Sequence, residues 1–147
     1  MDGMKQTEEI FTVLRACALR LTKTRKALVE LFFRHETPLS VPDILSELKG
    51  VMVMVNKTTV YRELERLEKL RIVDTVNLGD RKRYYELASR GHHHHLVCLR
   101  CDRVTDIDVN ERSLLVQEQR MNREKQFTIL RHSLEFFGLC GACRTAG

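Results

Sequence analysis

Residues 91–101 read Gly91-His92-His93-His94-His95-Leu96-Val97-Cys98-Leu99-Arg100-Cys101, in which four histidines lead directly into a Cys-x-x-Cys pair. A second pair, Cys140 and Cys143, follows close to the C-terminus. Two cysteine pairs at this spacing are typical of a closed, tetrahedral Zn²⁺ site. We therefore predict that one structural zinc ion binds Cys98, Cys101, Cys140 and Cys143.

The four histidines offer nitrogen ligands, which suit a borderline metal such as Fe²⁺, Mn²⁺, Co²⁺ or Zn²⁺. If they begin an extended strand, successive side chains point to opposite faces. His92 and His94 then form one set of donors, and His93 and His95 form another. The run therefore predicts two metal sites. A purification tag, the alternative explanation, is normally terminal, whereas this run lies inside the chain.

The 147-residue chain holds 25 Lys and Arg against 20 Asp and Glu, a net charge of +5 that permits a polyanionic partner. Its cysteines are odd in number and four of the five are closely paired, which argues against a secreted disulfide framework. Residues 1–11 lack the apolar run of a signal peptide, and no stretch approaches about 18 uncharged apolar residues. We therefore expect a cytoplasmic protein without a membrane partner.

The first half of the chain predicts four helices from its apolar periodicity and its caps. They cover residues 6–17, 23–33, 41–50 and 57–70. The predicted N-caps of the last three are Thr22, Ser40 and Asn56. Asp43 stands three residues after Ser40, which is the spacing of a capping box.

Three further expectations concern this region. Cys17 shares the apolar face of the first helix, so we expect it to be buried as a small hydrophobic side chain. Lys23, Arg25 and Lys26 make the first turn of the second helix basic, which favours an anion such as phosphate there. Residues 51–55 form a short apolar run, which we interpret as a buried extended connector.

The fourth helix carries the residues that indicate DNA binding. Val60, Leu64 and Leu67 form its core side, which leaves polar residues free on the opposite side of its N-terminal half. In a helix-turn-helix, that part of the second helix contacts base edges and phosphates in the major groove. Threonine, tyrosine and arginine suit thymine methyl groups, guanine and phosphate. The predicted DNA contacts here are Lys57, Thr58, Thr59, Tyr61 and Arg62.

Residues 72–76 and 83–87 predict the two strands of a hairpin with Gly79 at its tip. Residues 1–90 hold 17 Lys and Arg against 13 Asp and Glu, so most of the net charge lies in this half. Each charge taken singly is better explained by a solvated surface. Helices followed by a basic hairpin nevertheless favour a winged-helix DNA-binding domain over residues 1–90. The predicted DNA contacts outside the fourth helix are Arg20, Arg81 and Lys82.

Residues 91–147 predict a small α/β domain with strands over 103–109 and 127–138 and a mostly polar helix over 110–124. Long strands with little apolar core of their own suggest that the sheet is completed across a dimer interface. The sequence thus predicts an α+β protein, in which a winged-helix domain precedes a metal-binding dimerisation domain.

The combined motifs resemble those of the ferric uptake regulator family over about residues 10–143. The segments that carry the resemblance are residues 92–101, 58–62, 85–87, 132–134 and 138–143. The resemblance implies a repressor that binds AT-rich palindromic operators in double-stranded DNA when a regulatory metal is bound. It also implies a homodimer, with a tetramer as the alternative.

The resemblance implies three metal sites, of which the structural zinc falls on the four cysteines. The regulatory site, between the two domains, falls on Glu86, His93, His95, Asp106 and His35. His35 enters this set because Thr37 and Pro38 stand where the family has a histidine. A second family site falls on His92, His94, His132 and Glu111, with Glu111 in place of a carboxylate that aligns near Ser113.

Mixed nitrogen and oxygen ligands suit regulatory Fe²⁺ or Mn²⁺, although raw affinity favours Zn²⁺. We therefore predict an Fe²⁺-dependent repressor of metal-uptake genes, with a peroxide-, manganese- or zinc-sensing member of the family as the alternative. A metallohydrolase is disfavoured because no motif such as His-Glu-x-x-His appears. A zinc-stapled adaptor is the remaining alternative, and no enzymatic activity is expected.

Overall fold

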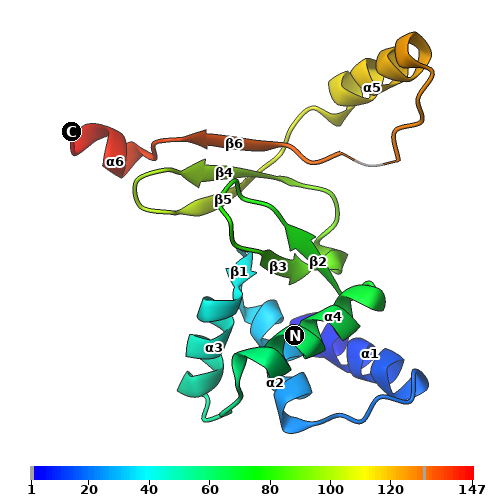
Figure 1. The fold of residues 1–147 in the computed structure, drawn as a ribbon, viewed down its shortest axis with the longest axis vertical. Coiled ribbons are helices and arrows are strands. Elements are labelled where there is room, and N and C mark those ends of the chain that lie inside the picture. The colour runs from blue at the N-terminus through cyan, green and yellow to red at the C-terminus, as the bar shows by residue number, and fades with distance from the viewer. Residues whose placement is uncertain (1, 131) are drawn as a thin grey trace. The chain divides into compact units, whose positions relative to one another are not determined.

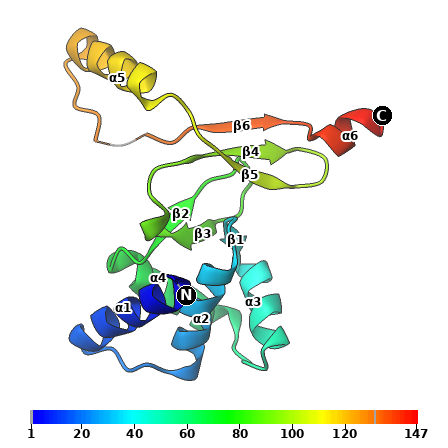
Figure 2. The same ribbon diagram turned by 180° about the vertical axis from the view of Figure 1, so that it is seen from behind.

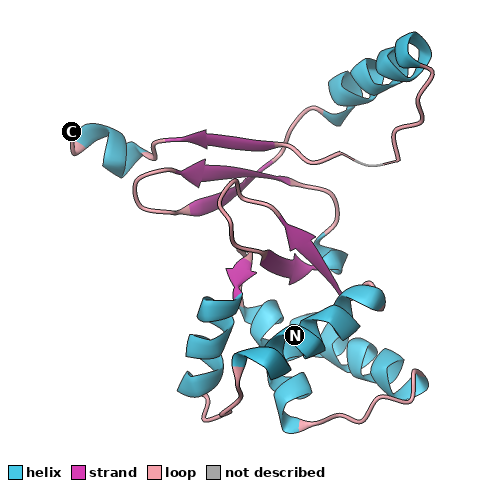
Figure 3. Ribbon diagram, viewed as in Figure 1, coloured by secondary structure: helices cyan, strands magenta, loops and turns pink. Residues whose placement is uncertain are grey.

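The computed structural model describes residues 2–130 and 132–147. The chain divides into two compact units, the first ending at Gly91 and the second running from His92 to Gly147 (Figure 1). Helices make up most of the first unit, whereas the second is built on a three-stranded sheet (Figure 3). None of the described helices is long and apolar enough to cross a membrane.

The first unit contains the four predicted helices and the predicted hairpin, which confirms the winged-helix fold. The structure adds a short strand and a 3₁₀ helix that the sequence did not predict. In chain order its elements are α1 (Asp2–Ala16), α2 (Lys23–Arg34), β1 (Leu39–Ser40), α3 (Val41–Gly50), α4 (Lys57–Lys69), β2 (Val73–Val76), β3 (Tyr84–Leu87) and η1 (Ala88–Arg90).

Local capping sets where three of these helices begin. The Thr22 side chain accepts a hydrogen bond from the N–H of Arg25, and the Asn56 side chain accepts one from Thr59. At α3, Ser40 accepts from the N–H of Asp43 while the Asp43 carboxylate accepts from the N–H of Ser40 at 2.9 Å. This is the predicted capping box, which satisfies N–H groups that have no partner inside the helix.

The core of the first unit lies where the helices meet the sheet. The strands are antiparallel in the order β1-β3-β2, and Leu39 of β1 stands opposite Tyr85 of β3. Complete burial of the apolar stripe of α4 sets the rotation of this helix, so its other side faces solvent. The largest fully buried side chains of the unit include Leu14, Leu28, Leu31, Ile44, Leu48, Leu64 and Leu67.

Two expectations for the first unit are wrong. Cys17 is exposed, because α1 ends at Ala16 and Ala18 adopts a positive φ of 57° that turns the chain away from the helical path. Residues 51–55 are not a buried connector. Met52 and Met54 are 81% and 77% exposed, and only Val53 is buried, because the positive φ of Met52 interrupts the extended path.

An anion lies at the first turn of α2, as expected, but it is a carboxylate of the protein itself. Arg25 is 5% exposed, and its guanidinium forms an ion pair with the buried carboxylate of Glu63 in α4. Arg25 also donates to the backbone carbonyl of Arg20. An internal glutamate is therefore the anion next to Arg25, for which phosphate was one candidate.

The second unit is a mixed sheet flanked by two helices. The strand order is β5-β4-β6, with β4 antiparallel to β5 and parallel to β6. Figures 1 and 2 show α5 and α6 at opposite ends of this sheet. The elements are β4 (His94–Cys98), β5 (Val104–Ile107), α5 (Glu111–Lys125), β6 (Glu135–Gly138) and α6 (Gly141–Thr145).

The strand predicted over 127–138 is much shorter in the structure, where only Glu135–Gly138 forms β6. Arg131, inside the predicted range, lies outside the described residues. The register explains the shortening: pairing between β4 and β6 begins with His95 opposite Glu135, and β4 itself begins only one residue earlier. Among the described residues, those before Glu135 therefore have no strand beside them.

The second unit has few buried apolar side chains, as expected from the sequence. None of the residues of α5 is buried, and Leu115 and Val116 of this helix are 53% and 62% exposed. Phe136 and Phe137 of β6 are 42% and 46% exposed. The described residues thus leave an apolar surface on this unit that has no partner within it.

Candidate metal centres and nucleic-acid interface

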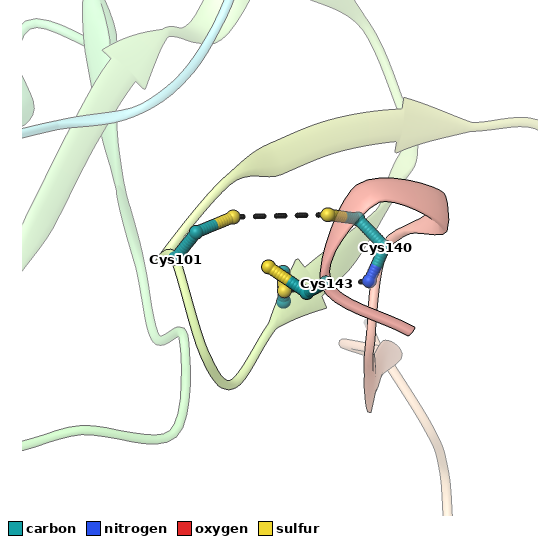
Figure 4. A group of neighbouring side chains, drawn as sticks. Cys101, Cys140 and Cys143 are labelled. Atoms are coloured by element: carbon teal, nitrogen blue, oxygen red, sulfur yellow. Dashed lines mark hydrogen bonds between the residues drawn. The ribbon is translucent and has the colours of Figure 1, made fainter. Parts of the chain in front are cut away.

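The four cysteines gather at one end of the second sheet. Cys98 ends β4 and Cys101 lies in the turn that follows, while Cys140 caps α6 and Cys143 lies inside it. The sulfur atoms all lie within 4.8 Å of one another. Figure 4 shows the thiols of Cys101, Cys140 and Cys143 turned toward one another. The structure thus brings the predicted set together.

The spacing of the sulfurs fits a metal ion better than a disulfide. Sγ of Cys101 lies 3.8 Å from Sγ of Cys140, and all the cysteines are free thiols. A disulfide requires about 2.05 Å. Four sulfurs arranged as a tetrahedron about 2.3 Å from a zinc ion stand about 3.8 Å apart. The cluster therefore has the dimensions and the donor chemistry of a closed zinc site.

Hydrogen bonds from the backbone favour thiolates in this cluster. The N–H of Cys140, then those of Cys101 and Arg100, lower the pKa of Cys98 to about 6. The N–H of Cys143 likewise lowers the pKa of Cys140. By contrast, hydrogen bonding of the Cys143 thiol to Cys140 raises the pKa of Cys143 to about 12. Complete ionisation of the set thus requires a cation, as expected of metal-binding thiols.

A second cluster joins β4, α5 and the segment before β6. Nε2 of His94, which is 1% exposed, lies 2.9 Å from Oε1 of Glu111, the first residue of α5. Nε2 of His92 lies 3.5 Å from the same oxygen. Nε2 of His132 lies 2.8 Å from Nε2 of His92. Three imidazoles and one carboxylate therefore converge, which is a donor set for a borderline divalent metal.

The other two histidines of the run form a separate pair, as the predicted alternation requires. The rings of His93 and His95 lie 4.8 Å apart, and His95 is buried. His95 stands opposite Asp106 in the register of β4 and β5, with Nε2 3.8 Å from Oδ1 of Asp106. This part of the second unit thus offers two nitrogen donors and one oxygen donor.

The other residues predicted for the regulatory site belong to the first unit. Glu86 lies in β3, is largely buried and accepts a hydrogen bond from Nη1 of Arg90 at 3.0 Å. His35 follows the last residue of α2, with Nε2 3.5 Å from Oε2 of Glu47. Pro38, in the position where a histidine was expected, is buried.

The predicted DNA contacts of α4 lie on the side of the helix opposite its core stripe. Lys57, Thr58 and Arg62 are exposed, Tyr61 is 41% exposed, and Thr59 is half-buried. Nζ of Lys57 lies 5.8 Å above the centre of the Tyr61 ring. The first two turns of α4 therefore present cationic, hydroxyl and aromatic groups together, which are suited to phosphates and base edges.

The hairpin between β2 and β3 is fixed at its tip by side chains. Asn77 accepts from the N–H of Gly79, whose positive φ of 83° favours glycine, and Asp80 accepts from the N–H of Lys82. The side chains of Arg81 and Lys82 are exposed, as is that of Arg20 before α2. The positive charges of the wing are therefore carried by a hairpin whose tip is fixed by hydrogen bonds.

Glu118, a half-buried residue of α5, was not among the residues predicted from the sequence. Its Oε1 lies 2.5 Å from Nδ1 of His132. The available signal was its spacing of seven residues from Glu111, which places both carboxylates on one helical face. The polar composition of the helix concealed that face, since other charged residues surround it.

Comparison with known proteins agrees with the fold. The family model described as "Ferric uptake regulator family" matches residues 16–137. The chain is 36% identical over 134 residues to the ferric uptake regulation protein of Bacillus subtilis (strain 168), an alignment that spans 88% of this chain and 89% of that protein.

Two solved structures share the architecture. The ferric uptake regulator of Helicobacter pylori superposes with a TM-score of 0.78 at 23% identity, over 97% of this chain and 93% of that one. The regulator of Francisella tularensis, solved with iron, superposes with a TM-score of 0.75 at 26% identity, over 86% and 95%. The chain therefore belongs to the ferric uptake regulator family, whose members are metal-responsive regulators of transcription rather than enzymes.

Proposed function

We propose that this protein is a cytoplasmic, Fe²⁺-dependent repressor of metal-uptake genes. The observation that carries the proposal is that His93, His95 and Asp106 lie close together in the first two strands of the second unit and the residue before them. Nitrogen and oxygen donors there suit Fe²⁺ or Mn²⁺. Glu86 and His35, from the winged-helix unit, are the further ligands that we propose for this regulatory site.

The choice of iron is based on the types of ligand in the regulatory site and on the proteins that the chain resembles. None of the described cysteines other than the zinc-binding set lies in the second unit, so the regulatory donors are imidazole and carboxylate. The Bacillus subtilis relative is named for ferric uptake regulation, and the Francisella tularensis structure contains iron. Mn²⁺ and Zn²⁺ are the alternative regulatory metals, and peroxide sensing is the alternative role.

The two remaining clusters have separate roles in the proposal. Cys98, Cys101, Cys140 and Cys143 hold structural Zn²⁺, which joins α6 to the β4–β5 turn and stabilises a unit with little apolar core. His92, His94, His132 and Glu111 form a second divalent-metal site, which joins α5 and the segment after it to β4.

We propose that DNA binding uses α4 and the wing of two protomers. Lys57, Thr58, Thr59, Tyr61 and Arg62 enter the major groove, and Arg20, Arg81 and Lys82 contact phosphates. The exposed apolar side chains of β6 and α5 support pairing of two second units as a homodimer, with a tetramer as the alternative. Two-fold symmetry then requires a palindromic operator, for which we propose an AT-rich sequence.

Metal binding would act by shifting the populations of the different arrangements that the two units adopt. Ligands contributed by both units select the arrangement that places two recognition helices one DNA turn, about 34 Å, apart. To change the ratio of DNA-competent to other arrangements from 1:99 to 99:1, the metal must bind the competent arrangement more favourably by about 5.5 kcal/mol. Two or three ligands available only in the competent arrangement are sufficient for a preference of this size.

The test is operator binding titrated with individual metals. Protein is purified without oxygen, its metal content is measured, and a duplex is selected from a random library at fixed salt concentration. We expect one tightly bound zinc per chain and tight binding to an AT-rich palindrome on addition of Fe²⁺. Binding without any added regulatory metal would contradict the proposal. A response to Mn²⁺ or Zn²⁺ alone would identify that ion, instead of Fe²⁺, as the regulatory metal.

A further inference from the structure

Helix α5 presents two carboxylates to the histidine cluster. Glu111 is its first residue and Glu118 follows seven residues, or about two turns, later on the same face. Glu111 approaches Nε2 of His94 at 2.9 Å, whereas Glu118 approaches Nδ1 of His132 at 2.5 Å. The two carboxylates therefore meet different nitrogen atoms, one facing the centre of the cluster and one facing away from it.

The contact with Glu118 determines which nitrogen of His132 is available. When the Glu118 carboxylate accepts this hydrogen bond, the neutral ring of His132 has its proton on Nδ1. Nε2 then carries a lone pair and points at Nε2 of His92, 2.8 Å away, and toward Glu111, whose Oε2 is 4.0 Å away. His132 is thus held in the tautomer that can bind a metal inside the cluster.

His94 is oriented in the same way by a backbone group. Its Nδ1 lies 3.1 Å from the carbonyl oxygen of Leu134, an acceptor that also requires the proton on Nδ1. Nε2 of His94 faces Oε1 of Glu111 at 2.9 Å, and this inner nitrogen is the one that a metal ion would bind in place of a proton. Two imidazoles of the cluster therefore have their outer nitrogen assigned to an acceptor, which is the usual arrangement around metal-binding histidines.

Burial separates Glu118 from a solvated surface glutamate. Its side chain is 20% exposed, against 50% for Glu111 and 58% for Glu124 on the same helix. Together with His92, Ile129, Leu130 and His132, it lines a pocket beside the cluster. The shielding strengthens the hydrogen bond to His132 and limits competition from water.

We propose that Glu118 is a positioning residue of the second metal site. It fixes the tautomer and the ring orientation of His132, so that Nε2 joins the donors of His92, His94 and Glu111 around one divalent cation. The inference rests on the proposed metal-binding role of that cluster. Loss of such an outer partner weakens metal affinity by about 10- to 100-fold.

The first test is a Co²⁺ titration followed by visible absorption. The background protein retains zinc on its cysteines and carries His93→Ala, which removes one regulatory donor. We expect Glu118→Leu to weaken Co²⁺ binding by about 10- to 100-fold. Glu118→Gln should restore most of the affinity, because its amide oxygen accepts the same hydrogen bond. The matched control is Glu124→Leu, which removes an exposed charge from the same helix and should change nothing.

The second test needs no metal. Nitrogen-15 spectra of the imidazole rings report which nitrogen carries the proton. We expect His132 to be protonated on Nδ1 in the parent protein and in Glu118→Gln, and to shift toward the Nε2-protonated form in Glu118→Leu. A merely structural role for Glu118 would not produce this pattern.

The outcomes separate the two proposals. If His132→Ala leaves the Co²⁺ titration unchanged, the second metal site itself is wrong and the inference falls with it. If His132→Ala removes a site but Glu118→Leu binds Co²⁺ as the parent does, only the role of Glu118 is wrong. An Nε2-protonated His132 in the parent protein would also overturn it.

Discussion

Arg25 and Glu63 join two helices of the winged-helix unit through a buried ion pair. Nε of Arg25 lies 2.7 Å from Oε2 of Glu63, Nη2 lies 3.0 Å from Oε1, and the two side chains are 5% and 8% exposed. Glu63 directly follows Arg62, one of the proposed DNA contacts. The pair therefore ties α4 to α2 and supports the helix rotation that burial of its apolar stripe sets.

We expect Glu63→Gln to lower the free energy of unfolding by about 3–5 kcal/mol, because it leaves the Arg25 charge buried without its counter-charge. Urea denaturation followed by circular dichroism measures the loss. The matched control is Glu65→Gln, which removes an exposed ion pair with Lys69 and should cost less than about 1 kcal/mol. Equal effects of the two substitutions would show that the buried pair has no special role.

Cys98→Ser should abolish zinc binding and either unfold the second unit or separate the dimer, because the four sulfurs act as one donor set. Metal analysis and size-exclusion chromatography measure both effects, and a strong chelator should reproduce them. Cys17→Ser, a change at an exposed cysteine outside the cluster, is the control and should leave zinc content unchanged. A stable, zinc-free dimer would show that the metal is dispensable.

His93→Ala should abolish the metal-dependent part of operator binding while fold and dimer remain intact. The reason is that a proposed regulatory ligand is lost from a position outside the core. Fluorescence anisotropy of a labelled operator, with and without Fe²⁺, measures the change. Asp108→Ala removes an exposed carboxylate just after β5 and serves as the control. An unchanged response of the His93 variant to Fe²⁺ would remove His93 from the regulatory site.

Lys82→Ala should weaken binding to all duplexes alike and lower the salt slope of log K by about 0.9, as expected for one lost phosphate contact. Arg62→Ala, if Arg62 contacts a base, should instead reduce discrimination between operator and random duplex by about 1–3 kcal/mol. Lys69→Ala, at the far end of α4, is the control for loss of one positive charge. If the salt dependence of log K does not change, Lys82 does not contact the DNA.

Tyr84→Phe should raise the pKa of Asp80. The Tyr84 hydroxyl donates to Oδ2 of Asp80 at 2.7 Å and is the main cause of the lowered pKa of this carboxyl, with the N–H and the charge of Lys82 as lesser causes. A lowered pKa stabilises the folded hairpin above the pKa of the unfolded chain, and this contribution disappears as pH falls through the folded value. Carboxyl NMR titration measures the shift, and Tyr61→Phe should leave it unchanged.

Signals within a few residues of one another were predicted well from the sequence. Thr22, Ser40 and Asn56 begin their helices as expected, because an N-cap needs only the side chain and the N–H three residues later. The alternation of the histidines also follows from local geometry, and the structure separates His92 and His94 from His93 and His95 accordingly.

Features that depend on tertiary contacts were not predictable in the same way. Arg25 and Glu63 are 38 residues apart, and nothing in the first turn of α2 indicates that its arginine is buried. The extent of β6 is set by the start of β4 in a neighbouring part of the sheet, which the apolar pattern of 127–138 does not contain. Glu118 acquires its partner only because the chain returns to place His132 beside α5.

The histidine run at 92–95 has a phase as well as a composition. Odd- and even-numbered imidazoles belong to different clusters, and strand pairing holds His94 and His95 in register. Inserting one residue between His93 and His94 would therefore move only His92 and His93 relative to β4. The contacts of His94 with Glu111 and of His95 with Asp106 would remain, but each of these residues would lose its partner histidine from the other half of the run. The spacing between the two halves of the run is therefore as important for the clusters as the number of histidines in it.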